Sequence, residues 1–443
     1  MQFHDSIAAI ATPIGQGAVG IVRISGHKLD ALADKLIGPL PPNRIATLRS
    51  VRTGDGRLID QALVVYFAAP KSYTGEDVLE IQTHGGIVQT RDVLQAAIDA
   101  GARMAAAGEF TERAYLNGKI DLIQAEAIAD LIESSSTRAA RLALSSLVGE
   151  FSKNVTSLVE KLKLTRIQLE AYIDFPDEDI SPVALASLSR ATTEVRDELV
   201  TLLANANRGA RLNSGVDAVI IGLPNVGKST LLNALAGEQR AIVTDVPGTT
   251  RDVLTVDLSI EGLSIRIHDT AGIRDSSDLI EQEGVRRAKQ KIEQSDLALY
   301  VTDADTDELI EFIRTINIPV LTVRNKIDVT GLVAESQKTA SGTTVRLSAK
   351  HLDGIGLLRR EILDHFNLAD DSNNAVLARQ RHLIALETAL GALAIDIDQL
   401  FQAEPELGAE QLRLAARALG ELTGEYTNED LLGDIFSSFC VGK

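Results

Sequence analysis

The segment Gly222-Leu-Pro-Asn-Val-Gly-Lys228-Ser229-Thr230 matches the phosphate-binding pattern G-x-x-x-x-G-K-[ST] at every fixed position. Residues 216–221 before it are apolar and rich in β-branched side chains, as expected of a buried parallel strand. Residues 231–236 after it have the composition of a helix that ends at Gly237. A glycine loop between a strand and a helix points backbone N–H groups at a polyphosphate, so the segment predicts a nucleotide-binding domain.

The composition places further bounds on the protein. A chain of 443 residues is too long for one core, so two to four domains are expected. No apolar run is long enough to span a bilayer, and Met1-Gln-Phe-His lacks a basic, apolar leader. The single cysteine, Cys440, excludes an intrachain disulfide and a cysteine-based zinc site, which together favour a cytoplasmic protein without a membrane anchor. The net charge of −18 argues against wholesale wrapping of nucleic acid, although a local basic patch remains compatible with it.

Changes in sequence texture divide the chain into three predicted domains. Residues 1–116 are expected to form a mixed α/β domain, and residues 117–209 with 371–443 an α-helical domain. Residues 210–370 are expected to form a doubly wound domain inserted into the helical one, with the preceding helices stopping near Gly209. The predicted fold class is therefore multidomain α/β. The expected N-terminal strands are residues 6–10, 18–24, 62–67 and 78–82, the expected N-terminal helix is 88–100, and helical periodicity marks 120–141, 142–170, 182–207, 375–401 and 409–421.

Two further motifs follow the glycine loop on the phosphate side of the predicted domain. The strand at residues 263–268 ends in Asp269-Thr-Ala-Gly272, where a carboxylate can hold Mg²⁺ through water and an N–H can approach the γ-phosphate. The sequence Gly248-Thr-Thr250 offers a hydroxyl, most simply that of Thr250, to complete the Mg²⁺ shell begun by Ser229. Lys228 can reach the β- and γ-phosphates.

Two motifs on the base side select guanine. Asn325-Lys-Ile-Asp328 follows a strand, and the Asp328 carboxylate can accept hydrogen bonds from guanine N1–H and the 2-amino group. Adenine lacks both donors, so the ligand is predicted to be GTP rather than ATP. Ser348-Ala-Lys350 can pack on the guanine from the other side. The residues predicted to bind GTP are Asn225, Val226, Gly227, Lys228, Ser229, Thr230, Thr244, Asp245, Val246, Pro247, Gly248, Thr249, Thr250, Asp269, Thr270, Ala271, Gly272, Asn325, Lys326, Asp328, Ser348, Ala349 and Lys350.

The residue after the Asp-x-x-Gly motif is Ile273, where Ras-like GTPases place a glutamine that orients the attacking water. An isoleucine cannot orient water, so the function must be supplied by another group. The alternative at this point is a protein that binds GTP and hydrolyses it poorly.

Short motifs are spread along the whole chain. They are Ala11-Thr-Pro13 with Gly20-Ile-Val-Arg-Ile-Ser-Gly26, Tyr73-Thr-Gly-Glu-Asp-Val-Leu-Glu80, Leu116-Asn-Gly-Lys119 with Gln124-Ala-Glu-Ala-Ile-Ala-Asp130, and Phe439-Cys-Val-Gly-Lys443. Together they resemble the motifs of the MnmE (TrmE) family of tRNA-modifying GTPases, to which the terminal Cys-x-Gly-Lys is quite specific.

The resemblance implies a homodimer whose N-terminal domain binds folate and dimerises. It implies that the protein works with an FAD-dependent partner, MnmG (GidA), in a heterotetramer. The pair would install a carboxymethylaminomethyl- or aminomethyl-type group at C5 of the wobble uridine of certain tRNAs, with a tetrahydrofolate derivative as one-carbon donor. GTP hydrolysis would drive G-domain dimerisation and conformational change.

The resemblance also implies what replaces the missing glutamine. K⁺ would bind beside the phosphates, held by Asn225 together with Thr244, Val246 and Thr249, and a cation there would stand where an arginine finger does, a role worth ~10³–10⁵ in rate. Pro247 stiffens this loop, which lowers the entropy cost of ordering it. Glu281 matches the glutamate that orients the hydrolytic water, with Glu283 as the alternative. The catalytic set implied is Glu281, Lys228 and Asn225.

The family likeness assigns folate contacts to Arg23, Glu80, Lys119 and Lys443. Without it, a strand-borne Arg or Glu is more often a surface ion pair. The role of Cys440 stays open between nucleophile, substrate contact and packing.

Two other functions compete with a tRNA-modifying GTPase. A regulatory ribosome-assembly GTPase similar to Era or Der would share the asparagine-bearing P-loop but lack the N-terminal domain and the terminal motif. An ATP-dependent scaffold is opposed by Asp328.

Overall fold

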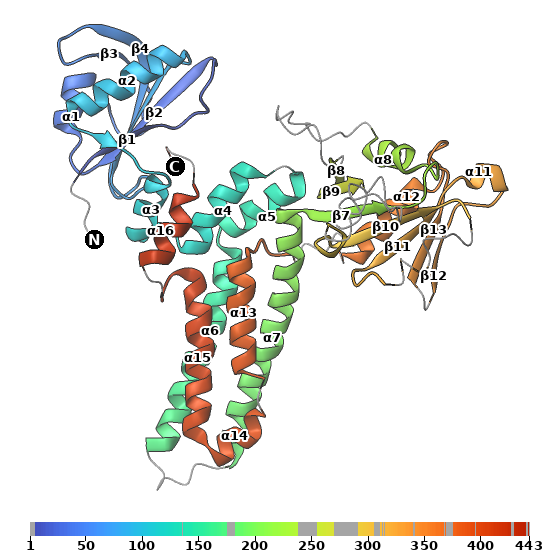
Figure 1. Ribbon diagram of the computed structural model, residues 1–443. Coiled ribbons are helices and arrows are strands. Elements are labelled where there is room, and N and C mark those ends of the chain that lie inside the picture. Colours follow the sequence, from blue (N-terminus) through green and yellow to red (C-terminus); the bar gives the residue numbers. More distant parts are fainter. Residues whose placement is uncertain are drawn as a thin grey trace, which may run out of the picture. The chain divides into compact units, whose positions relative to one another are not determined.

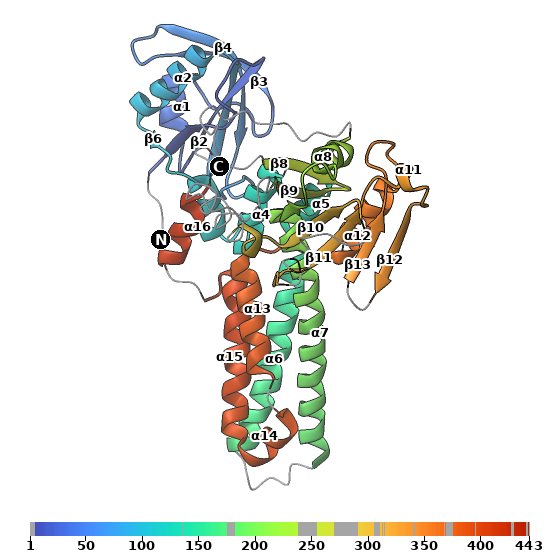
Figure 2. The same cartoon turned by 45° about the vertical axis from the view of Figure 1, so that its right-hand side comes forward.

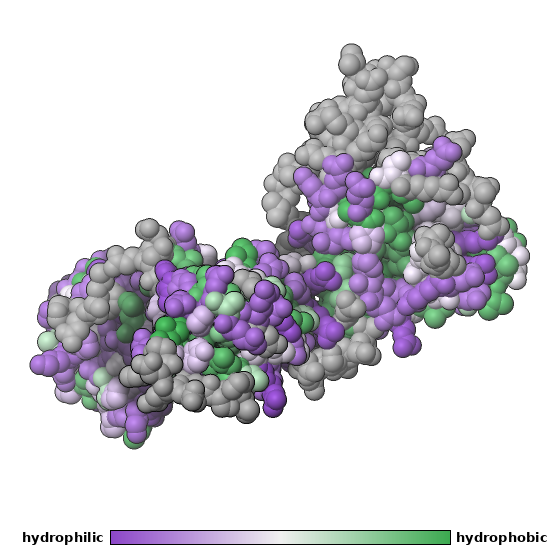
Figure 3. Space-filling view, turned by 90° about the horizontal axis from the view of Figure 1, so that it is seen from below, coloured by the Kyte–Doolittle hydropathy of each residue, from purple (hydrophilic) through white to green (hydrophobic). Residues whose placement is uncertain are grey.

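The structure is a computed structural model. It describes residues 5–134, 136–174, 182–237, 255–269, 291–304, 311, 313, 315–339, 342–366, 368, 375–394, 396–426, 429–439 and 442. The chain divides into two compact units, the first of residues 1–129, 147–166 and 412–443, and the second of residues 130–146 and 167–411. Within the described residues, no helix has the length and apolar character needed to cross a membrane. Among the coloured residues of Figure 3, hydrophilic side chains are interspersed with hydrophobic patches.

The first unit contains a six-stranded sheet in the order β3-β4-β5-β2-β1-β6, antiparallel except for the β1–β6 pair. Two helices pack against each other on one face of this sheet (Figure 1), where they cover a core that includes Val22, Ile24 and Leu94. The elements are β1 (Ile7–Ile10), β2 (Val19–Gly26), α1 (Asp30–Leu36), β3 (Thr47–Arg52), β4 (Leu58–Phe67), β5 (Asp77–His84), α2 (Ile87–Ala100) and β6 (Arg103–Met104).

The four predicted N-terminal strands and the predicted helix are confirmed as β1, β2, β4, β5 and α2. The edge strand β3 was not predicted, because arginines stand at two of its six positions and weaken the apolar alternation that marks a half-buried strand. The remaining helices of this unit gather around a cluster of Leu122, Phe436 and Phe439. These helices are α3 (Glu109–Leu116), α4 (Leu122–Glu133) and α16 (Glu429–Ser437). Three helices contribute residues to both units, namely α4, α6 (Glu150–Asp174) and α15 (Pro405–Thr423).

The second unit contains the predicted doubly wound sheet. Its seven strands run in the order β12-β13-β11-β10-β7-β9-β8, with five parallel strands in the middle and antiparallel β12 and β8 at the edges. Alternate residues of β7 enter two cores, Ala218 and Ile220 on one face and Val219 and Ile221 on the other, so both faces are covered. The elements are β7 (Val216–Ile221), α8 (Lys228–Ala236), β8 (Thr255–Ile260), β9 (Leu263–Asp269), β10 (Leu297–Thr302), β11 (Val320–Arg324), α11 (Ile327–Thr330), β12 (Glu335–Thr339), β13 (Gly342–Arg346) and α12 (Ile355–His365).

The helices of the second unit differ from the predicted spans. The periodic segment 120–141 is not one helix, because α4 ends at Glu133 and α5 (Thr137–Leu147) begins after a short break. The segment 375–401 forms a helix only from Gln380, as α13 (Gln380–Ala392) followed by α14 (Ile397–Ala403). Figures 1 and 2 both show α13 running along α7 (Pro182–Ser214), and the short α14 contacts α7 at one end.

The predicted end of a helix near Gly209 is wrong, because α7 continues to Ser214. Gly209 keeps a helical conformation, and a Cβ on it would lie 1.8 Å from the carbonyl oxygen of Val376. The returning chain crosses α7 at this point, and the Val376 N–H donates to the Asn205 carbonyl at 3.2 Å. The glycine therefore serves close backbone approach rather than helix termination. The side chain of Leu212, one turn later, already belongs to the core of the nucleotide domain.

Candidate functional site

The P-loop connects the carboxyl end of β7 to α8 and requires glycine at two of its positions. Gly227 has φ 97°, and a Cβ on it would lie 2.4 Å from Asn325 Nδ2. At the other end of the loop, a Cβ on Gly222 would lie 2.2 Å from the carbonyl oxygen of Val301, at the end of β10. Both positions hold the loop close to neighbouring backbone, which leaves its N–H groups at the helix N-terminus free of side-chain cover.

The predicted phosphate-binding side chains stand at the start of α8. Lys228 Nζ donates to the carbonyls of Gly222 at 2.7 Å and Leu223 at 2.9 Å, so the ammonium group lies across the loop. Ser229 follows Lys228 in the first turn and is exposed, as is Asn225, which adopts the left-handed conformation with φ 66°. This open loop with a cation across it fits a polyphosphate, and an exposed serine hydroxyl fits a Mg²⁺ ligand beside phosphate oxygens.

Asn325 links the P-loop to the base-side loops. Its buried side chain donates from Nδ2 to the Val226 carbonyl at 2.9 Å and accepts at Oδ1 from the Ala349 N–H at 3.0 Å. The sequence predicted Asn325 as a GTP-binding residue. The structure shows that it also fixes the spacing between the phosphate loop and the loop that carries Ser348-Ala-Lys350.

Asp328 is oriented by the neighbouring loop. Ser348 Oγ donates to Asp328 Oδ1 at 2.6 Å, and this hydrogen bond lowers the pKa of the Asp328 carboxyl group, so it is ionised at neutral pH. His351 Nε2 lies 3.8 Å from Oδ2, a contact that the sequence did not reveal. An ionised, oriented and accessible carboxylate is the acceptor that guanine N1–H and its 2-amino group require. Lys326 sits beside it with φ 64° and pairs with Asp303 at 2.7 Å.

Part of the predicted GTP and K⁺ site lies outside the described residues. The backbone of Asp269 is described as the last residue of β9, in register with Ile220, two residues before the P-loop begins. Among the described residues, no three His, Cys, Asp or Glu side chains group together in a way that could hold a metal ion. The predicted residues outside the described part are Thr244, Asp245, Val246, Pro247, Gly248, Thr249, Thr250, Thr270, Ala271, Gly272, Ile273, Glu281, Glu283, Cys440 and Lys443.

Two of the predicted folate residues contact each other in the first unit. Arg23 and Glu80 are direct partners on β2 and β5, and Arg23 Nε lies 2.9 Å from Glu80 Oε1. The Arg23 guanidinium also stands 5.6 Å from the centroid of the Tyr73 ring and 5.8 Å from that of Phe110. A half-buried cation between aromatic rings and beside a carboxylate can hold a flat heterocycle that has both donors and acceptors.

Lys119 approaches the loop that carries Tyr73. Its Nζ donates to the Pro70 carbonyl at 2.9 Å, and its stem lies 3.3 Å from where a Cβ on Gly75 would be. The described Gly442 reaches the same sheet, because a Cβ on it would lie 2.3 Å from the Ile10 carbonyl oxygen. Of the predicted folate residues, Arg23 and Glu80 thus contact each other. Lys119 contacts the loop that carries Tyr73, whose ring lies beside Arg23.

A buried ionic network lies near this site, and sequence reasoning missed it. Arg113 is fully buried and contacts Glu76 at 3.2 Å and Glu109 at 2.9 Å, while Ser25 Oγ donates to Glu76 at 2.8 Å. Burial raises the pKa of Glu109, but hydrogen bonds from Arg103, the Ala106 N–H and Arg113 outweigh it, so the pKa lies below its ordinary value. In the sequence, the only sign of this network was the spacing of four residues between Glu109 and Arg113, which allows an ion pair on one face of a helix.

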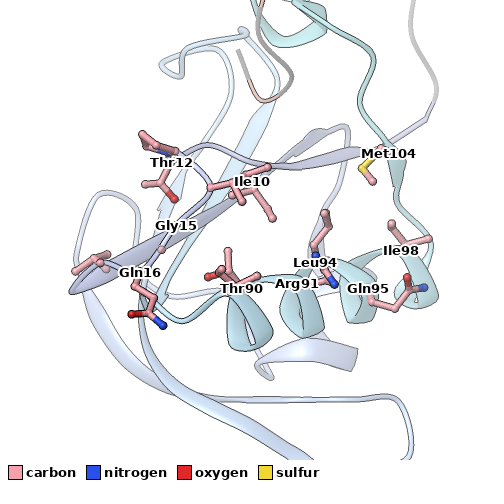
Figure 4. Close-up of a pocket in the computed structure, with 17 residues that line it drawn as sticks. Ile10, Thr12, Gly15, Gln16, Thr90, Arg91, Leu94, Gln95, Ile98 and Met104 are labelled. Atoms are coloured by element: carbon pink, nitrogen blue, oxygen red, sulfur yellow. The ribbon is translucent and has the colours of Figure 1, made fainter. Parts of the chain in front are cut away.

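A cavity of about 620 Å³ lies on the other face of the sheet. Figure 4 shows Thr90, Leu94 and Ile98 of α2 opposite Ile10 and the loop that carries Gln16. Arg23 points away from this face, because its neighbours Val22 and Ile24 pack in the core under α2. None of the three described folate candidates lines this cavity.

Comparison with known proteins matched two family models along the chain. Residues 6–119 match the model described as "GTP-binding protein TrmE N-terminus", and residues 122–440 match "MnmE helical domain". A protein of Methylococcus capsulatus named "tRNA modification GTPase MnmE" is 49% identical over 443 residues and covers 99% of each chain. A protein of Azoarcus with the same name is 46% identical over 445 residues and covers 99% of this chain and 98% of its own.

Among solved structures, a variant of Era from Aquifex aeolicus, bound to GDP and aluminium fluoride, is 27% identical. The alignment covers 40% of this chain and 66% of that one, with a TM-score of 0.27.

Proposed function

This chain belongs to the MnmE family of tRNA modification GTPases, and from that premise we propose a K⁺-stimulated GTPase that acts with an FAD-dependent partner of the MnmG (GidA) type on tRNA. The reaction proposed is modification of the wobble uridine at C5 to a carboxymethylaminomethyl- or aminomethyl-type group. The observation that supports it most directly is the Asp328 carboxylate oriented by Ser348 and tied through Asn325 to the P-loop.

In this proposal the base-side residues select the nucleotide. Asp328 accepts from guanine N1–H and the 2-amino group, and its bond from Ser348 keeps one oxygen in place before the base arrives. Because Asn325 joins both loops, placing the base also places the β- and γ-phosphates over the P-loop. Lys228 then leaves the carbonyls of Gly222 and Leu223 for phosphate oxygens, and Ser229 contributes a ligand to Mg²⁺.

The catalytic proposal rests on Asn225 among the described residues. K⁺ bound there would supply positive charge against the phosphate oxygens, in the place of an arginine finger. Asn225 is exposed at the tip of the P-loop in a left-handed conformation, and so its side-chain oxygen is accessible to such a cation. Thr244, Val246 and Thr249 would complete the shell, and Glu281 (or Glu283) would orient the water. G-domain dimerisation would bring these groups together.

The N-terminal residues are proposed to hold the one-carbon donor. Arg23 and Glu80 present a cation and a carboxylate side by side between aromatic rings, which suits the donor and acceptor edges of a pterin. Lys119, and Lys443 one residue beyond Gly442, would meet the glutamate tail. A homodimer, a heterotetramer with the partner and a cytoplasmic location complete the proposal.

The ribosome-assembly alternative receives no support from the relatives, which match nearly the whole chain and are named as tRNA modification GTPases. The three-domain division at residues 116, 209 and 370 also stays a prediction.

The decisive experiment is analysis of the wobble nucleoside in tRNA from cells that lack this protein. We expect the modified uridine to disappear and to return with the wild-type gene but not with an Asp328→Asn variant. Unchanged tRNA would refute the proposal. In parallel, GTP turnover by the purified protein should be much faster in KCl than in NaCl, and equal rates would remove the role of Asn225 and its loop.

A further inference from the structure

A concave basic surface lies at the edge of the first unit's sheet, between the end of α1 and strand β3. We call it the arginine edge and define it by Lys35, Arg49 and Arg52. These side chains, with Ser50 and Asp34, line an open cavity of about 460 Å³. Three cations against one carboxylate leave the cavity with a formal charge of +2, and none of the GTP or folate candidates lines it.

The arginine edge is positively charged, whereas the protein as a whole is negatively charged. The chain carries a net charge of −18, yet residues 35–57 hold five basic residues and one acidic residue. Strand β3 has six residues and spans about 20 Å. Arg49 and Arg52 are three residues apart, about 10 Å along this strand, and two cations so spaced match a ligand with repeated negative charges better than a single small anion.

Among the described residues, no carboxylate forms an ion pair with a cation of the arginine edge. Lys35 Nζ donates to the Ala100 carbonyl and Arg52 Nη1 to the Gly56 carbonyl, each at 3.0 Å. Arg49 Nε is buried and has no hydrogen-bond partner among the described residues. By contrast, nearby Arg57 lies 3.7 Å from Asp92. Because Nε itself is buried, a ligand would meet the exposed part of the Arg49 side chain, whose charge pairs with no described carboxylate.

We propose that the arginine edge binds the phosphate backbone of tRNA. The proposal rests on the function proposed above, and it adds the surface through which this chain holds its RNA. Arginine presents a planar fork of donors that fits phosphate oxygens in a bidentate manner, and two such forks on one strand set a direction for the backbone. These contacts position the RNA without reading its sequence, because phosphates carry no base information.

The test compares two double variants of the full-length protein in the absence of nucleotide. In the Arg49→Gln/Arg52→Gln variant, binding of an unmodified tRNA transcript is measured by titration over a range of KCl concentrations. Loss of two phosphate contacts should reduce the slope of log affinity against log salt by about 1.4 to 1.8, with an affinity loss of about 10- to 50-fold at 0.1 M salt. An Arg49→Lys/Arg52→Lys variant should recover most of the slope.

The matched control removes two charges that are already paired on other surfaces. Arg266 lies 3.0 Å from Asp257 and Arg417 lies 3.9 Å from Glu421, so Arg266→Gln/Arg417→Gln changes net charge by the same amount. We expect this control to keep the wild-type slope. Equal slope changes in both double variants would overturn the proposal, because they would indicate a general charge effect.

Three further outcomes have fixed meanings. Hydrogen-exchange protection of the α2 amides equal to wild type in the Arg49→Gln/Arg52→Gln variant shows that the first unit is folded, and an unchanged salt slope in such a folded variant overturns the proposal. Loss of binding to vesicles with 30% phosphatidylserine, together with unchanged tRNA binding, would also overturn it and point to lipid. If the wild-type chain binds no tRNA at low salt, the surface proposal fails while the wobble-uridine function can still stand through the partner.

Discussion

The nucleotide site of the second unit and the Arg23 site of the first unit both gather charged residues, yet they satisfy them in different ways. At the nucleotide site, Asn225 and Ser229 are exposed, and Asp328 keeps an accessible oxygen although Ser348 holds the other. In the first unit, Arg113 is neutralised by Glu76 and Glu109 out of contact with water. At the nucleotide site, polar groups remain available for hydrogen bonds to a ligand. In the Arg113 network, the charged groups already pair with one another and stabilise the fold.

This difference predicts how the two regions respond to mutation. A residue that waits for a ligand should affect binding strongly and folding little. A residue in a closed ionic network should affect folding strongly, because removal of one partner leaves a buried charge without compensation. Arg23 stands between these cases, since it is half-buried and paired but faces a surface that a ligand can reach.

The largest expected effect is at Asp328. Asp328→Asn should weaken GTP binding by about 10⁴-fold, because the amide nitrogen would face the donors of guanine instead of an acceptor. Xanthosine triphosphate, which carries a carbonyl in place of the 2-amino group, should recover much of the loss. Calorimetric titration with both nucleotides would decide this, and GTP affinity within threefold of wild type would show that Asp328 does not read the base.

The next effect is at Arg113. Arg113→Met should destabilise the first unit by about 3–5 kcal/mol, because Glu76 would stay buried without its arginine and Glu109 would keep only Arg103. Hydrogen exchange of the α3 amides would measure the loss, and nucleotide affinity should stay unchanged. Arg103→Gln is the matched control in the same network, and since Arg103 is about half exposed it should cost about 1 kcal/mol or less. Equal losses would remove the distinction between closed and open networks.

Acid should weaken the first unit through Glu109 and through Asp5, which lies 2.6 Å from Arg103 and 2.9 Å from Arg113. Burial raises the pKa of Asp5 and Glu109, but hydrogen bonds from Arg103 and Arg113 outweigh it and hold both below their ordinary values of 3.8 and 4.5. A group whose pKa falls on folding adds stability above its unfolded pKa and loses it as the pH drops through the folded value. Protection of α3 against hydrogen exchange should therefore fall below pH 4.5, and less steeply in Arg103→Gln. A flat profile from pH 6 to pH 3 would contradict this origin.

The smallest expected effect on folding is at Arg23. Arg23→Gln should change stability by about 1 kcal/mol or less, since its ion pair with Glu80 is partly solvated. Under the folate proposal it should weaken binding of 5-formyltetrahydrofolate by about 10-fold or more, measured by equilibrium dialysis. A stability loss as large as that of Arg113→Met would place Arg23 with the structural network instead.

Local sequence was sufficient where the chemistry is carried by contiguous residues. The P-loop, the Asp328 motif and the parallel sheet follow from glycine spacing and strand composition, and the structure confirms the sheet and the two described loops as neighbours. It was insufficient where partners are distant in sequence. Arg113 meets Glu76, and Ala349 meets Asn325, only because the fold brings separate segments together. The prediction at Gly209 failed because a glycine in a helix can serve either an ending or a close crossing, and local sequence does not distinguish them.

The close crossing at Gly209 holds together the two segments of chain that lead into and out of the nucleotide domain. Val376 is pinned to α7 at Asn205 and Gly209, and Arg211 lies 5.6 Å from the ring centroid of Phe366. Because the two connections are joined at this point, a rotation of the nucleotide domain should move both of them together. The movement should therefore be transmitted to α7. Insertion of residues into one connection alone should tilt the nucleotide domain. Equal insertions into both connections should uncouple its movement from α7.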